Sequence, residues 1–259
     1  MAAALCCLAL AVTAGSSAHA ELTRPPTAAE RSAAAASEVA GRWRSWPAGR
    51  IFPAVLRYTT ALQTRETARR VGISAGAGCT AAVAAAAGRQ ALRDGCRAAL
   101  RATYADQLQG VLYTIGVFAF TGPREAGAFI RALAGDADRG QAGPCAFGSD
   151  PRAVRCLHDY GDFSVLATGR FPWYGLRAFA VPGTAGASFT EAARQVMTGR
   201  QQGPYVVLAV AGYADGRPAA ASRQPRYAIF RPARQLAAEV LGPLSAPGDV
   251  TCAQPEWLC

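Results

Sequence analysis

The chain has 259 residues, of which 51% are hydrophobic and 17% are charged, and its formal net charge at pH 7 is +10. A chain of this length and hydrophobicity can bury a core as one domain, or as one domain with appendages. All 27 basic residues are arginine, but they are scattered and never form a run of five, so we expect no specific nucleic-acid binding. A basic surface favours anionic partners, and we expect the partner to be an anionic wall polymer, a lipid or a small ligand.

The first twenty residues have the pattern of an export signal. Residues 2–13 form an apolar run that is too short for a comfortable membrane span. The A-x-A site Ala18-His19-Ala20 follows, so we predict a signal peptide over residues 1–20, cleaved after Ala20. The mature protein would then be secreted or extracytoplasmic, with no transmembrane helix. An uncleaved N-terminal anchor is the alternative, because no basic residue precedes the apolar run.

The cysteines agree with export. Six of the eight lie beyond the predicted signal peptide, and an even number suits an oxidising compartment. Their grouping along the chain favours three local disulfides, Cys79–Cys96, Cys145–Cys156 and Cys252–Cys259. We predict no bound metal, because the mature chain has no C-x-x-C spacing and only one histidine.

Residues 21–50 are rich in Ala and Pro, and we predict a loosely ordered N-terminal segment there. Thr27 and Glu30 have the spacing of a capping box, so a helix should begin at this point and end at Gly41. Residues 51–259 are predicted to form a single domain.

The predicted domain contains strands and helices that follow one another along the chain. The strongest signal is the run at 111–120, which is apolar on both faces and therefore predicts a central strand. The run at 205–213 has the same character. Further strands are expected at 51–60, 96–104, 163–168 and 176–181, with 227–230 as a returning strand, and Pro53 places the first of them at a sheet edge. Helices are expected at 64–71, 81–91, 123–133, 190–198 and 232–241.

The order strand-strand-helix recurs at 96–133 and 163–198. It predicts an α+β fold, in which an antiparallel or mixed sheet carries helices packed on one face. The units would repeat in a ferredoxin-like manner, and the disulfides would staple the fold.

Three stretches resemble a family of exported actinobacterial proteins of no known activity. They are IFPAVLRYTTALQTRETARRVGI at 51–73, RATYADQLQGVLYTIGVFAF at 101–120 and GPYVVLAVAGYADGRP at 203–218. The resemblance implies export and a single folded ectodomain. It implies no reaction, cofactor or site residue.

A hydrolase would have to use His158, the only histidine of the mature chain, with Asp159 or Asp162 as its orienting carboxylate and a serine such as Ser164 as nucleophile. No serine of the mature chain lies in a G-x-S-x-G elbow. No G-x-G-x-x-G or phosphate-loop pattern follows a predicted strand, so we predict no cofactor. We therefore assign no catalytic residue.

The most distinctive candidate binding residues are aromatics interleaved with arginines, namely Arg170, Phe171, Trp173, Tyr174 and Arg177. Such a set can stack a planar or sugar-like ligand by cation–π contacts. The alternative is that these aromatics anchor the core between two strands.

These patterns together predict an exported, non-catalytic binding or sensory module of the cell envelope, whose ligand the sequence does not specify. One alternative is a secreted hydrolase that uses His158. The other is a structural envelope protein without a small ligand.

Overall fold

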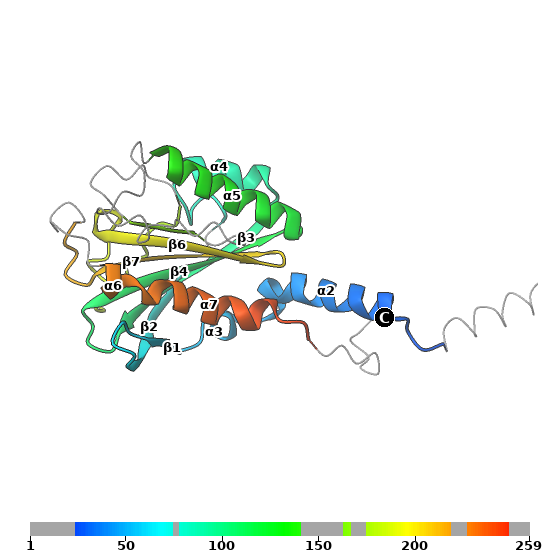
Figure 1. The fold of residues 1–259 in the computed structure, drawn as a ribbon, viewed down its shortest axis with the longest axis horizontal. Helices are drawn as coiled ribbons and strands as arrows, with labels where there is room; N and C mark the ends of the chain where they lie inside the picture. The colour runs from blue at the N-terminus through cyan, green and yellow to red at the C-terminus, as the bar shows by residue number, and fades with distance from the viewer. Residues whose placement is uncertain (1–23, 75–77, 141–162, 167–174, 219–226, 249–259) are drawn as a thin grey trace, which may run out of the picture. The chain divides into compact units, whose positions relative to one another are not determined.

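The computed structural model describes residues 24–74, 78–140, 163–166, 175–218 and 227–248 (Figure 1). By internal contacts the chain divides into two compact units, residues 1–38 with 247–259, and residues 39–246. The predicted signal peptide, two of the three predicted disulfides and His158 lie outside the described residues. The predicted domain boundary at residue 50 stays a prediction.

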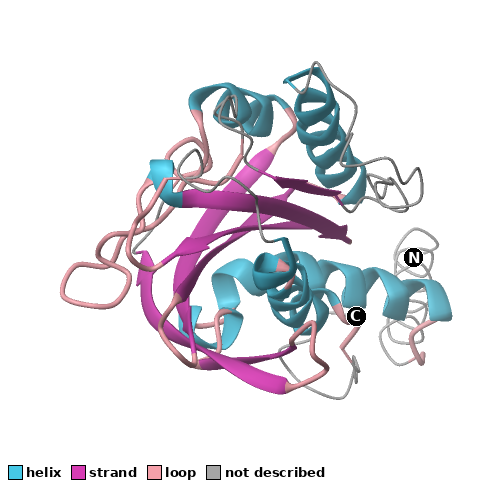
Figure 2. Ribbon diagram, turned by 60° about the vertical axis from the view of Figure 1, so that its left-hand side comes forward, coloured by secondary structure: helices cyan, strands magenta, loops and turns pink. Residues whose placement is uncertain are grey.

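Within the described residues, seven strands form one sheet, and every neighbouring pair is antiparallel (Figure 2). The fold is therefore α+β, as the sequence predicts, with the antiparallel form of the sheet. In spatial order the strands are β1 (Val55–Thr59), β2 (Arg65–Ser74), β3 (Cys96–Asp106), β4 (Val111–Phe120), β7 (Tyr205–Tyr213), β6 (Arg194–Gln202) and β5 (Phe163–Leu166).

The strand β4 lies at the centre of this sheet and is buried along its whole length, which confirms the predicted central strand. Its side chains alternate between two cores, because successive residues of a strand point to opposite faces. Tyr113 and Val117 belong to one core, whereas Leu112 and Phe118 belong to the other. Its neighbour β7 is buried in the same way, apart from its last residue.

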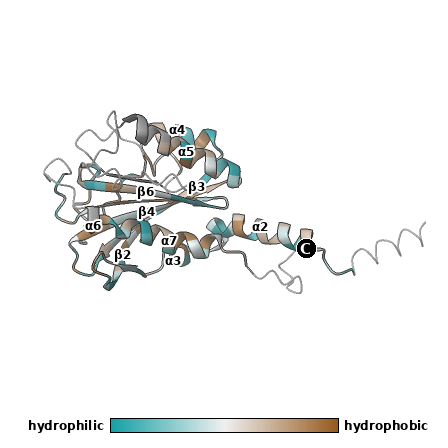
Figure 3. Cartoon of the chain, in the orientation of Figure 1, coloured by the Kyte–Doolittle hydropathy of each residue, from teal (hydrophilic) through white to brown (hydrophobic). Residues whose placement is uncertain are grey.

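Helices cover both faces of the sheet (Figure 1). On one face, α7 (Pro232–Ser245) packs its apolar residues into the core that contains Tyr113. On the other face, α5 (Pro123–Gly140) packs against Phe118, and α4 (Ala85–Arg93) joins the same core. Apolar residues recur along α5 and α7 (Figure 3), and those of α7 belong to the first core whereas those of α5 belong to the second. The prediction of helices on one face is wrong, because β4 and β7 would then expose an apolar face to water.

The other described helices are short, with the exception of the first. They are α2 (Ala28–Ser45), α3 (Ala48–Ile51) and α6 (Tyr227–Phe230), with a single 3-10 turn at Glu191–Ala193.

The described part of residues 163–198 does not form the second predicted strand-strand-helix unit. The expected helix at 190–198 is replaced by the 3-10 turn and by the start of β6. Val196 enters one core and Met197 the other, which is the period of a strand. The hairpin partner of β7 is accordingly β6, and residues 227–230 form α6 instead of a returning strand. The ferredoxin-like repetition is therefore wrong.

The expected helix at 64–71 is also wrong, because these residues belong to β2. A tight hairpin turn joins β2 to β1, and the Thr60 backbone N–H donates to the Thr64 carbonyl at 2.9 Å. The strand β2 pairs with β1 over residues 65–69 and with β3 over residues 68–74. Tertiary pairing outweighs the local helix-start pattern of this segment.

The strand β1 lies at the edge of the sheet, as predicted from Pro53. A side chain of α7 covers part of this edge. The Gln235 amide accepts from the Thr59 backbone N–H and donates to the Thr59 carbonyl, each at 2.8 Å. The free groups that a further strand would use at Thr59 are therefore already bonded.

Arg42 links α2 to the C-terminal end of α7. Arg42, on α2, is buried, and its guanidinium donates to the carbonyls of Pro243, Leu244 and Ala246 at 2.9, 3.2 and 2.6 Å. These carbonyls lie at the C-terminal end of α7, where the helix dipole is negative. The helix α7 continues past Gly242, where the sequence predicts its end.

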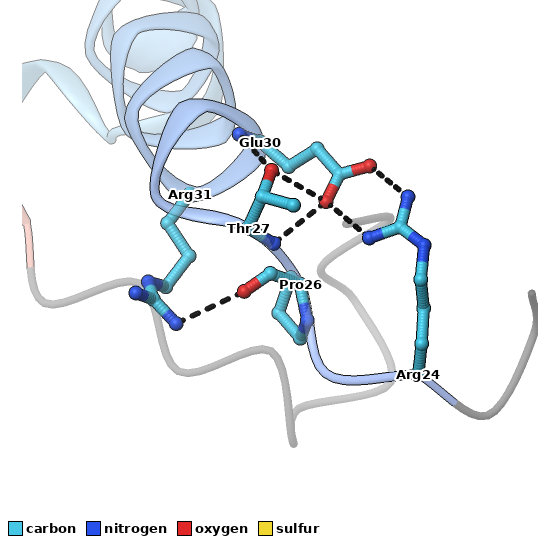
Figure 4. A network of polar contacts seen from close by, with 5 residues as sticks. All are labelled: Arg24, Pro26, Thr27, Glu30 and Arg31. Atoms are coloured by element: carbon cyan, nitrogen blue, oxygen red, sulfur yellow. Dashed lines mark hydrogen bonds and ion pairs between the residues drawn. The ribbon is translucent and has the colours of Figure 1, made fainter.

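The start of α2 has the predicted capping box (Figure 4). The Thr27 backbone N–H donates to the Glu30 carboxylate at 2.7 Å, and the Glu30 backbone N–H donates to the Thr27 hydroxyl at 3.2 Å. Arg24 adds two hydrogen bonds to the same carboxylate, at 2.8 and 2.6 Å. The bonds from Arg24, and then those from Thr27, lower the pKa of Glu30 from 4.5 to about 2.

We predict that this cap persists at mildly acidic pH. Because the pKa of Glu30 is lower in the folded chain, the carboxylate stabilises the helix start fully above pH 4.5 and loses that contribution as the pH falls through about 2. The measurement is an NMR titration of the Glu30 carboxyl and the Thr27 amide. Arg24→Gln should raise the pKa of Glu30, and a midpoint near 4.5 in the unmodified chain would contradict the cap.

The disulfide Cys79–Cys96 is present and ties the start of β3 to the segment before α4, as the sequence predicts. The bonded residues are 17 positions apart. Closing a loop of this size reduces the entropy of the unfolded chain, which is worth about 3 kcal/mol. The other two predicted pairs lie outside the described residues and stay predictions.

Replacing both cysteines of this bond, Cys79→Ala with Cys96→Ala, should lower the free energy of unfolding by about 3 kcal/mol. Urea denaturation measures this loss. Peptide mapping of the unmodified protein without reduction is the control, and it should recover Cys79 bonded to Cys96. A peptide that links Cys79 to Cys145 would contradict the predicted layout.

Candidate anion-binding site

Only one of the five predicted binding residues lies in the described part of the chain. Arg170, Phe171, Trp173 and Tyr174 lie outside it, so the aromatic set stays a prediction. Arg177 is exposed, and its backbone N–H donates to the Ala82 carbonyl at 2.9 Å. The expected strand at 176–181 is reduced to one bridge between Leu176 and Val83.

The segment that follows Leu176 lies on the sheet face that α4 and α5 also cover. Leu176 is fully buried and packs directly over Gly116 of β4. A Cβ atom at Gly116 would lie only 2.4 Å from Leu176 Cδ1, so a larger residue there would push the segment away. Gly116 thus lets the chain approach the sheet closely.

Two buried threonines hold the same segment by its backbone. The Phe179 N–H donates to the Thr114 hydroxyl at 3.1 Å, and the Thr103 hydroxyl donates to the Phe179 carbonyl at 2.6 Å. The two hydroxyl oxygens lie 2.9 Å apart. Because the Thr103 proton is directed to Phe179, the Thr114 hydroxyl donates to Thr103. Both backbone groups of Phe179 are bonded, although no strand pairs with it.

Arg194, the first residue of β6, is buried beneath this segment and is 8% exposed. Its guanidinium donates to the Leu176 carbonyl at 2.7 Å and forms an ion pair with the Glu191 carboxylate at 2.9 Å. Its Nε also donates to the Glu191 carbonyl at 3.2 Å. Arg194 therefore fixes the carbonyl next to Arg177.

Arg101 of β3 lies beside the next residue of the segment. Its Nη1 donates to the Arg177 carbonyl at 3.5 Å, a long contact, and its guanidinium lies 5.5 Å from the centre of the Phe179 ring. The Nε atom of Arg101 is buried and has no hydrogen-bond partner among the described residues. A buried N–H group without a partner costs about 1–3 kcal/mol.

Positive charge exceeds negative charge around this point. Burial lowers the pKa of both Arg101 and Arg194, Glu191 opposes that shift, and the charge of Arg177 adds to it. The positive charge of Arg177 thus acts on two partly buried guanidinium groups, and Glu191 is the one carboxylate identified as acting on both. An anion bound there would supply the missing charge and a partner for Arg101.

Sequence reasoning missed Arg101 and Arg194. Arg101 falls on the polar face of the predicted strand at 96–104, which reads as a solvent-facing position. The distant segment around Phe179 covers that face, and no local pattern announces such a contact. Arg194 falls in the wrongly predicted helix at 190–198.

Among the described residues, no group of three or more His, Cys, Asp or Glu side chains could hold a metal ion. No described helix is both long and apolar enough to cross a membrane. No protein-family model, curated protein or solved structure matches the chain. A ligand for the arginine cluster of Arg101, Arg177 and Arg194 must therefore be inferred from the geometry of these residues alone.

Removing the Thr114 hydroxyl should loosen the segment that carries Arg177. We expect Thr114→Val to lower the free energy of unfolding by about 1–3 kcal/mol, because the Phe179 N–H loses its buried acceptor. Chemical denaturation measures this. Thr67→Val, at a half-buried position of β2, is the matched control and should change stability by less than about 0.5 kcal/mol. Equal losses in the two variants would contradict the role of Thr114.

Proposed function

We propose that the protein is an exported, non-catalytic binding module of the cell envelope, and that it binds an anionic ligand through Arg101 and Arg177, with Arg194 behind them. The observation that carries this proposal is the buried Nε of Arg101, which lacks a partner among the described residues beside two further guanidinium groups. The predicted signal peptide and the resemblance to exported actinobacterial proteins support the location.

The chemistry of the cluster suits a phosphate or carboxylate group. A guanidinium presents several N–H donors in one plane, which match two oxygens of such a group. Partial burial strengthens the attraction, because the effective dielectric constant is lower than in water. Arg177 is exposed and Arg101 is half-buried, so an anion can approach these two side chains from solvent.

A phosphate-bearing wall polymer is the ligand class that we favour. Its charges repeat along a chain, and the remaining positive charge of the protein would attract neighbouring groups over a distance of about 10 Å at moderate salt. The alternative of a hydrolase rests on His158, and no described residue supports it. The proposed role is therefore recognition, with no bond made or broken.

The test is calorimetric titration with inorganic phosphate and with purified wall polymer. The double variant Arg101→Gln with Arg177→Gln should weaken binding of both at least about tenfold, because charge-assisted hydrogen bonds are each worth about 1.5–3 kcal/mol. Binding to the unmodified protein should also weaken as salt is raised.

The matched control is Arg89→Gln with Arg97→Gln, which removes the same charge from exposed positions on α4 and β3. It should bind nearly as well as the unmodified protein. If both double variants lose affinity equally, the effect is general electrostatics and the site is wrong. No binding of either ligand by the unmodified protein would also reject the proposal.

A further inference from the structure

Two hairpin turns lie at the same end of the sheet. The first joins β1 to β2 through residues 60–64, and the second joins β3 to β4 through residues 107–110. The strands β2 and β3 pair with each other, with Ala68 opposite Asp106, so the two hairpins are neighbours and point the same way. The turn between β6 and β7 lies at the opposite end, because Tyr213 at the far end of β7 pairs with Val111.

Each of these two turns exposes one leucine. Leu62 is 88% exposed and Leu108 is 86% exposed, and these are the largest exposed fractions among the large hydrophobic residues described. A leucine that is nearly free of protein contacts at the tip of a hairpin contributes almost nothing to folding. Turns favour Gly, Asn, Asp or Ser at such positions.

The local backbone of the two tips is also the same. The residues after the leucines, Gln63 and Gln109, have positive φ angles of 61° and 54°, and no other non-glycine residue described does. In both tips this residue donates its N–H to the carbonyl three positions earlier, Thr60 or Asp106, at 3.1 and 3.0 Å. Each tip is therefore a tight turn followed by a left-handed residue.

The turn at the opposite end of the sheet provides an internal comparison. There the left-handed position is occupied by Gly203, with φ of 56°, and no large apolar residue is exposed beside it. Glycine is the residue that this conformation favours. Each of the two leucine tips thus has two features that do not favour turn stability. One is an exposed leucine, and the other is a glutamine in a left-handed conformation that favours glycine.

Around the first tip, exposed arginines outnumber carboxylates, whereas the second tip begins at Asp106 and has no arginine beside it. Neither turn contains a carboxylate, and the hairpin of β1 and β2 exposes Arg65 beside its turn and Arg57 two residues before the end of β1. The nearest carboxylates are engaged with the protein. Asp106 accepts from the backbone N–H groups of Gly110 and Val111 at 2.7 and 3.0 Å, and Glu66 accepts from the Tyr58 hydroxyl at 2.8 Å.

We propose that the two hairpin tips dock the protein on a bilayer that contains anionic lipids, with Leu62 and Leu108 inserted at the headgroup boundary. Burial of apolar side chains together with attraction of arginines to anionic headgroups is the usual basis of interfacial binding. Two single leucines on separate tips suit a soft lipid surface better than a protein partner, which would bury one contiguous apolar patch. This docking surface is independent of the arginine cluster around Arg101.

The experiment is vesicle flotation of the full chain. Vesicles of equal parts phosphatidylglycerol and phosphatidylcholine should carry the protein, and vesicles of phosphatidylcholine alone should carry much less of it. Leu62→Gln with Leu108→Gln should reduce binding to the anionic vesicles by about a hundredfold, which is about tenfold for each leucine removed from water. Both positions are exposed, so thermal unfolding should be unchanged in the variant.

The matched control is Leu92→Gln on α4, where the leucine is 56% exposed on a helix. It should float like the unmodified protein, and so should the variant that lacks Arg101 and Arg177. Equal flotation of the two-leucine variant and the unmodified protein would overturn the proposal. So would equal binding to neutral vesicles, or a self-association that size-exclusion chromatography shows to depend on the two leucines.

Discussion

The structure depends on the fact that its two central strands are apolar on both faces. The strands β4 and β7 pair with each other at the middle of the sheet, and nearly every residue of both is buried. Neither face of such strands can be left to water, since the exposed area would forfeit the hydrophobic stabilisation of the core. The chain therefore needs α7 on one side, and α4, α5 and the segment around Phe179 on the other. The candidate site lies where the segment around Phe179 covers this second face of the sheet.

Hydrogen bonds from buried polar groups define the position of the segment around Phe179 more precisely than apolar packing alone would. Thr103 and Thr114 bond both backbone groups of Phe179, and Arg194 holds the Leu176 carbonyl. A buried donor or acceptor that lost its partner would be costly, so the segment has one favourable position. Arg101 is the exception in this set, because its Nε remains without a partner. The contrast between satisfied neighbours and one unsatisfied guanidinium is what makes the cluster a candidate for binding.

The sequence predicted the parts of the fold whose signals are local. The strands β4 and β7, the start of α5, the capping box at Thr27 and the bond Cys79–Cys96 were recognisable from residue type and spacing. The strands β2 and β6 were predicted as helices, because helix-start residues precede them and the pairing that makes them strands comes from distant parts of the chain. Arg101 was hidden for the same reason, since only the folded chain brings Phe179 over the polar face of β3.

The hydrogen bonds between Gln235 and Thr59 bear on when, during synthesis, the edge strand β1 is protected from aggregation. Gln235 lies 176 residues beyond Thr59, so the ribosome makes the edge of β1 long before it makes the side chain that blocks part of that edge. During this interval the nascent sheet presents unpaired N–H and carbonyl groups to other chains. Docking of α7 buries an apolar face and also covers the edge at Thr59. The last described helix therefore completes the core and also removes one of the places where this edge could pair with a second chain.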